Sequence, residues 1–204
     1  MESIKKNKIK NIISIAITIV LVFVVSMLLI RNTCYLTIVI SGESMSPTLN
    51  NGDYGYAIKT NYAKKHINRF DIMVFEDEVS HKNIIKRVIG LPGETISFKN
   101  EDSDLYVNEN MIDQYFIDDA IKAQTITNSS VYQKDDEIVI PNDAYFVLGD
   151  NRSNSKDSLH GLGFIYQKQV KGILTAIIAN CREISVSGNR EICNDKYYKG
   201  ITFF

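Results

Sequence analysis

Three short segments of the sequence carry side chains that together can perform acyl transfer. Ser44 lies in Ser41–Leu49, where Gly42 permits unusual backbone angles and a proline fixes its own φ. A serine hydroxyl becomes a nucleophile only when a base lies within hydrogen-bond reach. Lys86 stands in the apolar, β-branched run Ile84–Ile89, and such burial can lower the pKa of a lysine far enough to make it that base. The pattern therefore predicts a serine nucleophile with a lysine base.

Each segment also has an ordinary structural interpretation when it is taken alone. Four hydroxyl side chains, a glycine and a proline within nine residues describe any surface turn. A lysine in a strand can extend its charged end into water while its methylene stem covers apolar surface. Taken alone, the sequence around Lys86 favours a lysine whose charged end is in water. The presence of the Ser44 segment makes the buried base the better interpretation.

The third segment, Gly149–Ser158, completes a pattern that resembles the bacterial type I signal peptidases with a single anchor helix. The matching motifs are S-G-x-S-M-x-P-T-L, K-R-V-I-G-L-P-G and G-D-N-R-x-N-S-x-D-S, and the resemblance runs from about Ile40 to about Ile178. It implies that Ser44 is the nucleophile and Lys86 its general base in a serine endopeptidase. This enzyme would remove signal peptides from exported preproteins after small residues of the Ala-x-Ala type, without a metal or other cofactor.

The resemblance also implies how the reacting groups are held. The backbone N–H of Ser44 would stabilise the oxyanion. Some relatives supply a second donor from a serine that is Gly42 here, so a backbone N–H near Gly42 or a water would replace it. Ser155 matches a serine that orients the lysine.

Four charged residues match a polar scaffold around the site: Arg87, Asp150, Arg152 and Asp157. The family pattern suggests that Arg87 pairs with Asp150. The sequence departs from the pattern at Leu159, where D-S-R would supply an arginine partner for Asp157. Either Arg152 covers Asp157, or this site is looser than those of its relatives, because an unpaired buried charge is costly.

The resemblance further implies small apolar pockets for the substrate. The matching positions are Ile40, Met45, Leu49, Ile84 and Ile85. Packing in the protein core explains the same residues equally well, and both interpretations can hold at once.

The elements that position these segments begin with an apolar run at residues 12–30, preceded by four lysines within residues 5–10. A helix of about 20 residues crosses the hydrocarbon core of a membrane. The lysines before the run predict a cytoplasmic N-terminus at 1–11 and an extracytoplasmic catalytic domain at 31–204. The run is too long for a cleavable signal peptide and lacks a small-residue exit.

Short β-branched and aromatic runs with turn residues between them predict an all-β domain after the helix, so the chain as a whole is mainly β. The resemblance implies that this domain is signal-peptidase-like. A polar stretch at about 100–140 predicts a smaller inserted lobe. Residues 170–179 fit a strand or a helix by pattern, and the resemblance implies a strand. Cys181 and Cys193 can form a disulfide in an exported domain, although free buried thiols are equally compatible with the sequence.

Composition and the motifs separate the rival functions. A net charge of −1 argues against nucleic acid as a partner, and we expect a monomer whose partners are signal peptides and the lipid bilayer. A non-proteolytic assembly factor or chaperone for surface proteins is the alternative, yet such relatives lose the serine or the lysine. A self-cleaving repressor would be soluble with a DNA-binding segment. The endoplasmic-reticulum branch would have histidine at Lys86.

Overall fold

The computed structural model describes residues 2–59, 67–127, 132, 135–187 and 190–204. The chain forms two compact units, Met1–Tyr35 and Leu36–Phe204.

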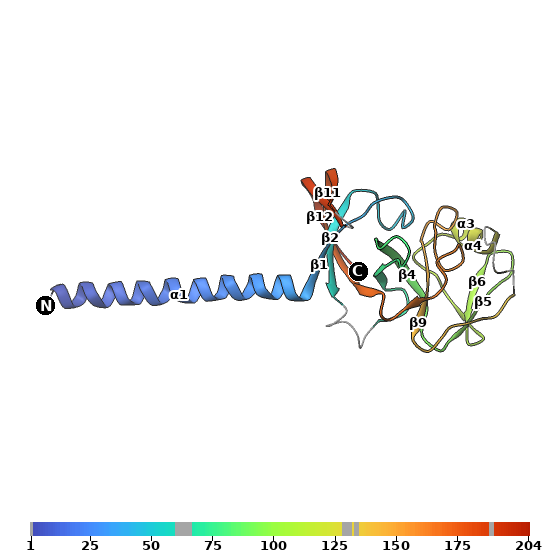
Figure 1. Ribbon diagram of the computed structural model, residues 1–204, viewed down its shortest axis with the longest axis horizontal. Coiled ribbons are helices and arrows are strands. Elements are labelled where there is room, and N and C mark those ends of the chain that lie inside the picture. The colour runs from blue at the N-terminus through green and yellow to red at the C-terminus, as the bar shows by residue number, and fades with distance from the viewer. Residues whose placement is uncertain (1, 60–66, 128–131, 133–134, 188–189) are drawn as a thin grey trace. The chain divides into compact units, whose positions relative to one another are not determined.

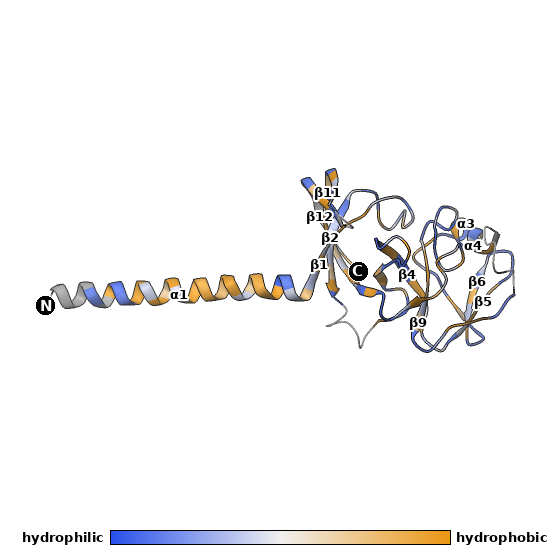
Figure 2. Cartoon of the chain, in the orientation of Figure 1, coloured by the Kyte–Doolittle hydropathy of each residue, from blue (hydrophilic) through white to orange (hydrophobic). Residues whose placement is uncertain are grey.

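The first unit is a single long helix, α1 (Glu2–Cys34). It includes Ile9–Cys34, the one stretch in the described residues that is long and apolar enough to cross a membrane. Figure 2 shows that apolar residues dominate this stretch. A helix that is apolar on every side and exposed along its length fits a lipid environment better than water. The predicted helix at 12–30 is confirmed, and it extends further at both ends.

The second unit consists of two antiparallel sheets (Figure 1). The strands of the large sheet are β1 (Tyr35–Val39), β2 (Asp53–Lys59), β3 (Ile72–Glu76), β4 (Asn83–Gly90), β9 (Ala144–Leu148), β10 (Ile165–Tyr166), β11 (Val170–Ser187) and β12 (Arg190–Phe203). They follow the order β1-β2-β11-β3-β4-β9-β10, with β12 paired to β11. The mainly β fold predicted from the sequence is confirmed, and the apolar segment from residue 170 is a strand.

The small sheet has the order β7-β6-β5-β8. Its elements are β5 (Thr95–Lys99), β6 (Asp104–Val107), β7 (Asn110–Ile112) and β8 (Ile138–Val139), with two short helices, α3 (Asp119–Lys122) and α4 (Gln124–Thr127). An ion pair of 3.2 Å between Lys122 and Asp104 joins α3 to β6. Since β5 begins at Thr95, the small sheet starts a few residues before the stretch at about 100–140 that the sequence predicts as a lobe.

A shared apolar core joins the two sheets. Ile96 and Phe98 of the small sheet pack in one buried cluster with Phe146 and Leu148 of β9. Leu159 belongs to the same cluster and is fully buried. Because β4 and β9 are neighbours in the large sheet, this core fixes the small sheet beside the strand that carries Lys86.

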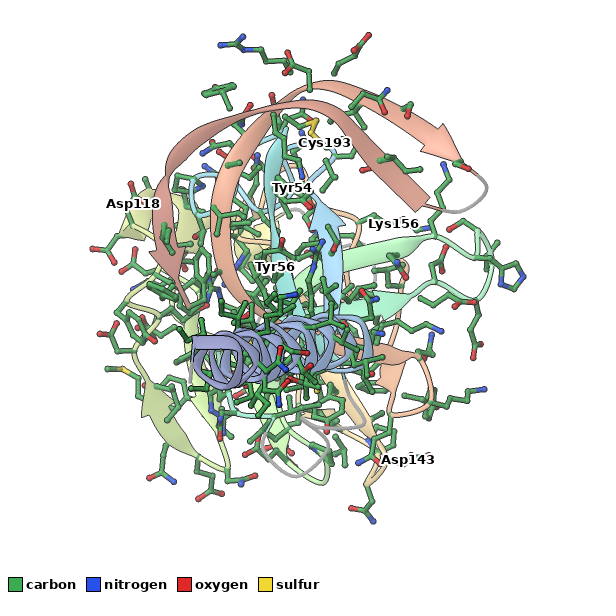
Figure 3. The ribbon with its side chains drawn as sticks, turned by 90° about the vertical axis from the view of Figure 1, so that its left-hand side faces the viewer. Tyr54, Tyr56, Asp118, Asp143, Lys156 and Cys193 are labelled. Atoms are coloured by element: carbon green, nitrogen blue, oxygen red, sulfur yellow. A yellow bond between two sulfur atoms is a disulfide. The ribbon has the colours of Figure 1, made fainter. Side chains whose placement is uncertain are left out.

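The last two strands form a long hairpin that is closed by a disulfide. Cys181 and Cys193 are bonded, with their Cα atoms 5.7 Å apart, and Figure 3 shows the sulfur–sulfur bond at the label of Cys193. The structure thus selects the bonded state from the two that the sequence left open. Among the described residues Cys34 is the only free cysteine.

Candidate active site

The loop that carries Ser44 is closed at its base by backbone hydrogen bonds. The N–H of Ile40 donates to the carbonyl of Asp53, and the N–H of Gly52 donates back to the carbonyl of Ile40, both at 2.8 Å. Gly42 has a φ of +91°, in the left-handed region that favours glycine. The loop is therefore a fixed path between β1 and β2, with Ser44 half-buried near its centre.

Apolar side chains on both sides of Ser44 anchor this loop in the core. Met45 and Leu49 are buried in one cluster with Ile40, and Ile85 of β4 packs against it. Ile84 packs instead against a second cluster, to which Met73 of β3 and Val88 of β4 belong. Of the five residues predicted to line substrate pockets, the structure brings four together and leaves Ile84 apart. Their role in a pocket stays a prediction.

Lys86 reaches Ser44 from the middle of β4. That strand lies between β3 and β9, and Lys86 pairs in register with Met73 of β3. Its Nζ donates to Ser44 Oγ at 2.6 Å. Burial lowers the pKa of the Lys86 ammonium from 10.5 to about 8, although the carboxylates of Asp157 and Asp150 oppose the change. A lysine with a pKa of about 8 is neutral in about a tenth of molecules at pH 7 and in about half of them at pH 8.

The third segment holds the serine loop in place from the other side. The backbone N–H of Asn151 donates to the carbonyl of Ser44 at 3.1 Å, and its side-chain amide donates to the carbonyl of Glu43 at 3.2 Å. A side chain at Gly149 would lie 2.5 Å from the carbonyl oxygen of Ser44 and 2.2 Å from Ser155 Oγ. Glycine is needed there because the two segments approach so closely.

Two predicted contacts of the reacting groups differ in the structure. Ser155 Oγ is buried beside Gly149, but it makes no hydrogen bond to Lys86 or to any other described residue. The N–H of Gly42 is already donated to Asn51 Oδ1 at 2.9 Å, so it is not a free second donor for an oxyanion.

Arg87, the residue after Lys86, forms a buried bidentate ion pair with Asp150. Its Nε donates to Oδ1 at 2.8 Å and its Nη2 to Oδ2 at 2.6 Å. Nη1 donates to the carbonyl of Phe70 at 2.8 Å, and the guanidinium lies 4.2 Å from the centre of the Phe116 ring. The structure therefore places Arg87 and Asp150 as the family pattern suggests.

Arg152 does not cover Asp157, which corrects one of the two alternatives drawn from the sequence. Its Nε donates to the carbonyl of Gly149 at 3.1 Å, its Nη2 to Gln114 at 2.7 Å and its Nη1 to Thr125. Burial lowers the pKa of Arg152 to about 10. Because Gln114 and Thr125 belong to the lobe, Arg152 ties the lobe to the third segment. Nothing in the sequence signals these distant partners.

Asp157 is fully buried, and its carboxylate has other donors. The N–H groups of Leu159 and Gly149 donate to it at 3.1 and 3.0 Å, and His160 Nδ1 lies 2.8 Å from its Oδ1. The missing arginine thus leaves no unpaired carboxylate. Sequence reasoning missed His160, although its spacing of three residues from Asp157 in a turn-rich segment is a signal that could have indicated it.

The arrangement as a whole can support acyl transfer. A half-buried hydroxyl meets an amine of lowered pKa, and a rigid polar scaffold lies behind both. The described residues contain no group of three or more His, Cys, Asp or Glu side chains that could hold a metal ion.

Comparisons with known proteins place the sequence among named relatives. A family model described as signal peptidase, peptidase S26, matches residues 10–179. Signal peptidase I S of Bacillus subtilis (strain 168) is 37% identical over 177 residues, which is 84% of this chain and 91% of that protein. Signal peptidase I P of Bacillus subtilis subsp. natto is 35% identical over 169 residues, with 83% and 88% covered. A crystal structure of a signal peptidase I from Enterococcus faecalis V583 is 32% identical, covers 53% of this chain and 97% of that chain, and has a TM-score of 0.40.

Proposed function

This chain belongs to the signal peptidase family, peptidase S26, and on that premise we propose that it is a serine endopeptidase that removes signal peptides from preproteins. Ser44 is the nucleophile and Lys86 the general base. The observation that carries these roles is the 2.6 Å hydrogen bond between Lys86 Nζ and Ser44 Oγ at a buried lysine of lowered pKa.

The reaction follows from this contact. Neutral Lys86 takes the proton of Ser44 Oγ as the oxygen attacks the scissile carbonyl carbon. The ammonium then returns the proton to the leaving amine, and an acyl-enzyme remains. Lys86 then takes a proton from a water that attacks the ester carbonyl. As the bond to Ser44 Oγ breaks, the Lys86 ammonium returns this proton to the serine oxygen, and the signal peptide is released as a carboxylic acid. The N–H of Ser44 is one donor to the oxyanion in each step.

Substrate choice rests on the apolar residues beside Ser44. Met45, Leu49 and Ile85 belong to one apolar cluster beside Ser44, and a substrate side chain that binds against this packed cluster would have to be small and apolar. This supports cleavage after Ala-x-Ala sequences, since one extra methylene in such a site is worth about 1–3 kcal/mol of discrimination.

The apolar helix α1 anchors the enzyme in a membrane as a monomer, with the N-terminus in the cytoplasm and the catalytic domain outside. The four lysines within residues 5–10, which lie in α1 before its apolar run at residues 12–30, support this orientation. Protease added to intact protoplasts should digest the catalytic domain and leave a tag at the N-terminus protected. Protection of the domain instead would reverse the orientation.

The deciding experiment is cleavage of a purified preprotein by the full chain in detergent or lipid. We expect cleavage at an Ala-x-Ala site, and a loss of about 10³-fold or more in kcat/KM for both Ser44→Ala and Lys86→Met. Ser80→Ala and Lys168→Met are matched controls, because both residues are exposed and outside the site, and they should cut at the native rate.

The pH dependence tests the base separately. Since only neutral Lys86 accepts the proton, kcat/KM should rise about tenfold per pH unit below the pKa of about 8 and level off above it. If the folded, membrane-bound native chain cuts no preprotein, the assembly-factor interpretation takes the place of this one.

A further inference from the structure

We propose that His160 is a positioning residue for this reaction: it holds the buried Asp157 carboxylate and so limits how strongly that negative charge acts on Lys86. The inference rests on the proposed function, because it concerns the same lysine. It assigns a role to a residue that lies outside the three motifs.

The local chain path brings His160 back to Asp157. Leu159 points into the core between the two sheets, where it is fully buried. The next N–H, that of His160, donates to the carbonyl of Asp157 at 3.0 Å, and the N–H of Leu162 donates to the same carbonyl at 2.9 Å. This tight turn places the imidazole Nδ1 2.8 Å from Asp157 Oδ1. An arginine is thus not required to reach the carboxylate from position 159.

Among the described residues, His160 is the side chain that donates to the Asp157 carboxylate. The side chain of Asp157 has no exposed surface, and its other donors among the described residues are the backbone N–H groups of Gly149 and Leu159. A buried carboxylate that loses a donor acts more strongly on neighbouring charges, because the medium around it is poorly polarisable. The imidazole nitrogen that faces an ionised carboxylate must carry a proton, so Nδ1 is the protonated nitrogen.

The carboxylate of Asp157 is one of two that act on Lys86. Its charge and that of Asp150 both favour the protonated ammonium and so oppose the effect of burial. Asp150 is already neutralised by Arg87 in a bidentate pair. The cation Arg152 also interacts with both carboxylates, although it donates its hydrogen bonds elsewhere. His160 is therefore the donor that offsets the remaining charge.

The test measures the titration of Lys86 directly by NMR, in full-length protein labelled at lysine Cε. The Lys86 resonance is assigned by its absence in Lys86→Met. We expect His160→Ala to raise the titration midpoint by about 0.5–1 pH unit, because the charge of Asp157 is less offset. His160→Asn should restore the midpoint to within about 0.3 pH unit, since its amide nitrogen replaces Nδ1 as a donor.

Activity gives the second readout. In His160→Ala, kcat/KM should fall about 3–10-fold at pH 7 and approach the native value above about pH 9.5, where Lys86 is neutral in both proteins. His81→Ala is the matched control, because that histidine is exposed and pairs only with the surface residue Glu76. A loss that is equal at every pH, or an unmoved Lys86 midpoint, would show that His160 is structural and overturn the proposal.

A third measurement needs no variant and no activity. The ¹⁵N spectrum of the histidines in the native chain should show the Nδ1–H tautomer for His160. The Nε2–H tautomer would overturn the proposal even if His160→Ala did not fold. Because the lysine and histidine spectra do not depend on cleavage, an inactive native enzyme would contradict the proposed function and leave this inference separately testable.

Discussion

Lys86 and Arg87 are neighbouring cations on β4, and they differ in the partners that their charges have. Lys86 is 3% exposed and Arg87 is 6% exposed, so water reaches neither well. Arg87 donates from all three of its nitrogens and pairs with the Asp150 carboxylate. Among the described residues, Lys86 donates its hydrogen bond to a neutral hydroxyl, that of Ser44. The described residues therefore compensate the charge of one cation and leave that of the other largely uncompensated.

The difference fits the roles proposed for the two residues, with Arg87 in the scaffold and Lys86 as the general base. A buried charge with a well-placed opposite charge keeps its ionisation, whereas a buried charge without one gives up its proton more easily. Burial lowers the pKa of Lys86, and Lys86 has no ion pair like that of Arg87 with Asp150 to offset the effect. The lowered pKa means that holding Lys86 charged in the folded protein costs free energy.

The largest effect should follow from breaking the compensated pair. Arg87→Met leaves the Asp150 carboxylate buried without its partner, so we expect the free energy of unfolding to fall by about 3–5 kcal/mol. Urea denaturation monitored by circular dichroism would measure it. Arg69→Met is the matched control: Arg69 pairs with Glu94 in the same bidentate manner but is partly exposed, so about 1 kcal/mol is expected. Equal losses in the two variants would contradict the comparison.

An opposite change is expected when the uncompensated cation is removed. Lys86→Met should abolish activity and yet raise the free energy of unfolding, by up to about 3 kcal/mol near pH 7. That figure corresponds to the lowering of the lysine pKa from 10.5 to about 8. Denaturation of the native chain and the variant at one pH gives the difference.

The pH dependence of this difference checks its origin. Below about pH 8 Lys86 is protonated in both the folded and the unfolded chain, and the full cost is present. Between about 8 and 10.5 the unfolded chain binds more protons, so the native protein should gain stability with rising pH while the variant does not. A constant gap over this window would mean that better packing of Met, and not charge, stabilises the variant.

The smallest of the three effects concerns Arg152, whose partners are neutral. Arg152→Met leaves buried polar atoms of Gln114 and Thr125 without that donor, at a cost of about 1–3 kcal/mol. Thr125→Val in the same background should add little, because the two side chains share one interaction. If the double variant were additive, the link between the lobe and the third segment would be weaker than the contacts suggest.

The strands could be predicted well from the sequence, and their partners could not. Short β-branched and aromatic runs with turn residues between them indicate where β3, β4 and β9 lie, because that pattern depends on neighbouring residues alone. The length of the last hairpin was missed. Its second strand is held by register with β11 and by the disulfide, which are long-range features.

The sequence by itself determined the long apolar helix and the mainly β fold, and it predicted the pairing of Ser44 with Lys86, because each is written in a local pattern or motif. Only the tertiary structure decided which charges meet. Arg152 turns to Gln114 and Thr125, Ser155 makes no contact with Lys86, and His160 takes the place beside Asp157. Gln114 and Thr125 are distant from Arg152 in the sequence and meet it only when the chain folds. His160 is near Asp157 in the sequence, but the path of the turn between them depends on the burial of Leu159 in the core. Their choice is made by packing and by the cost of leaving a buried charge without a donor.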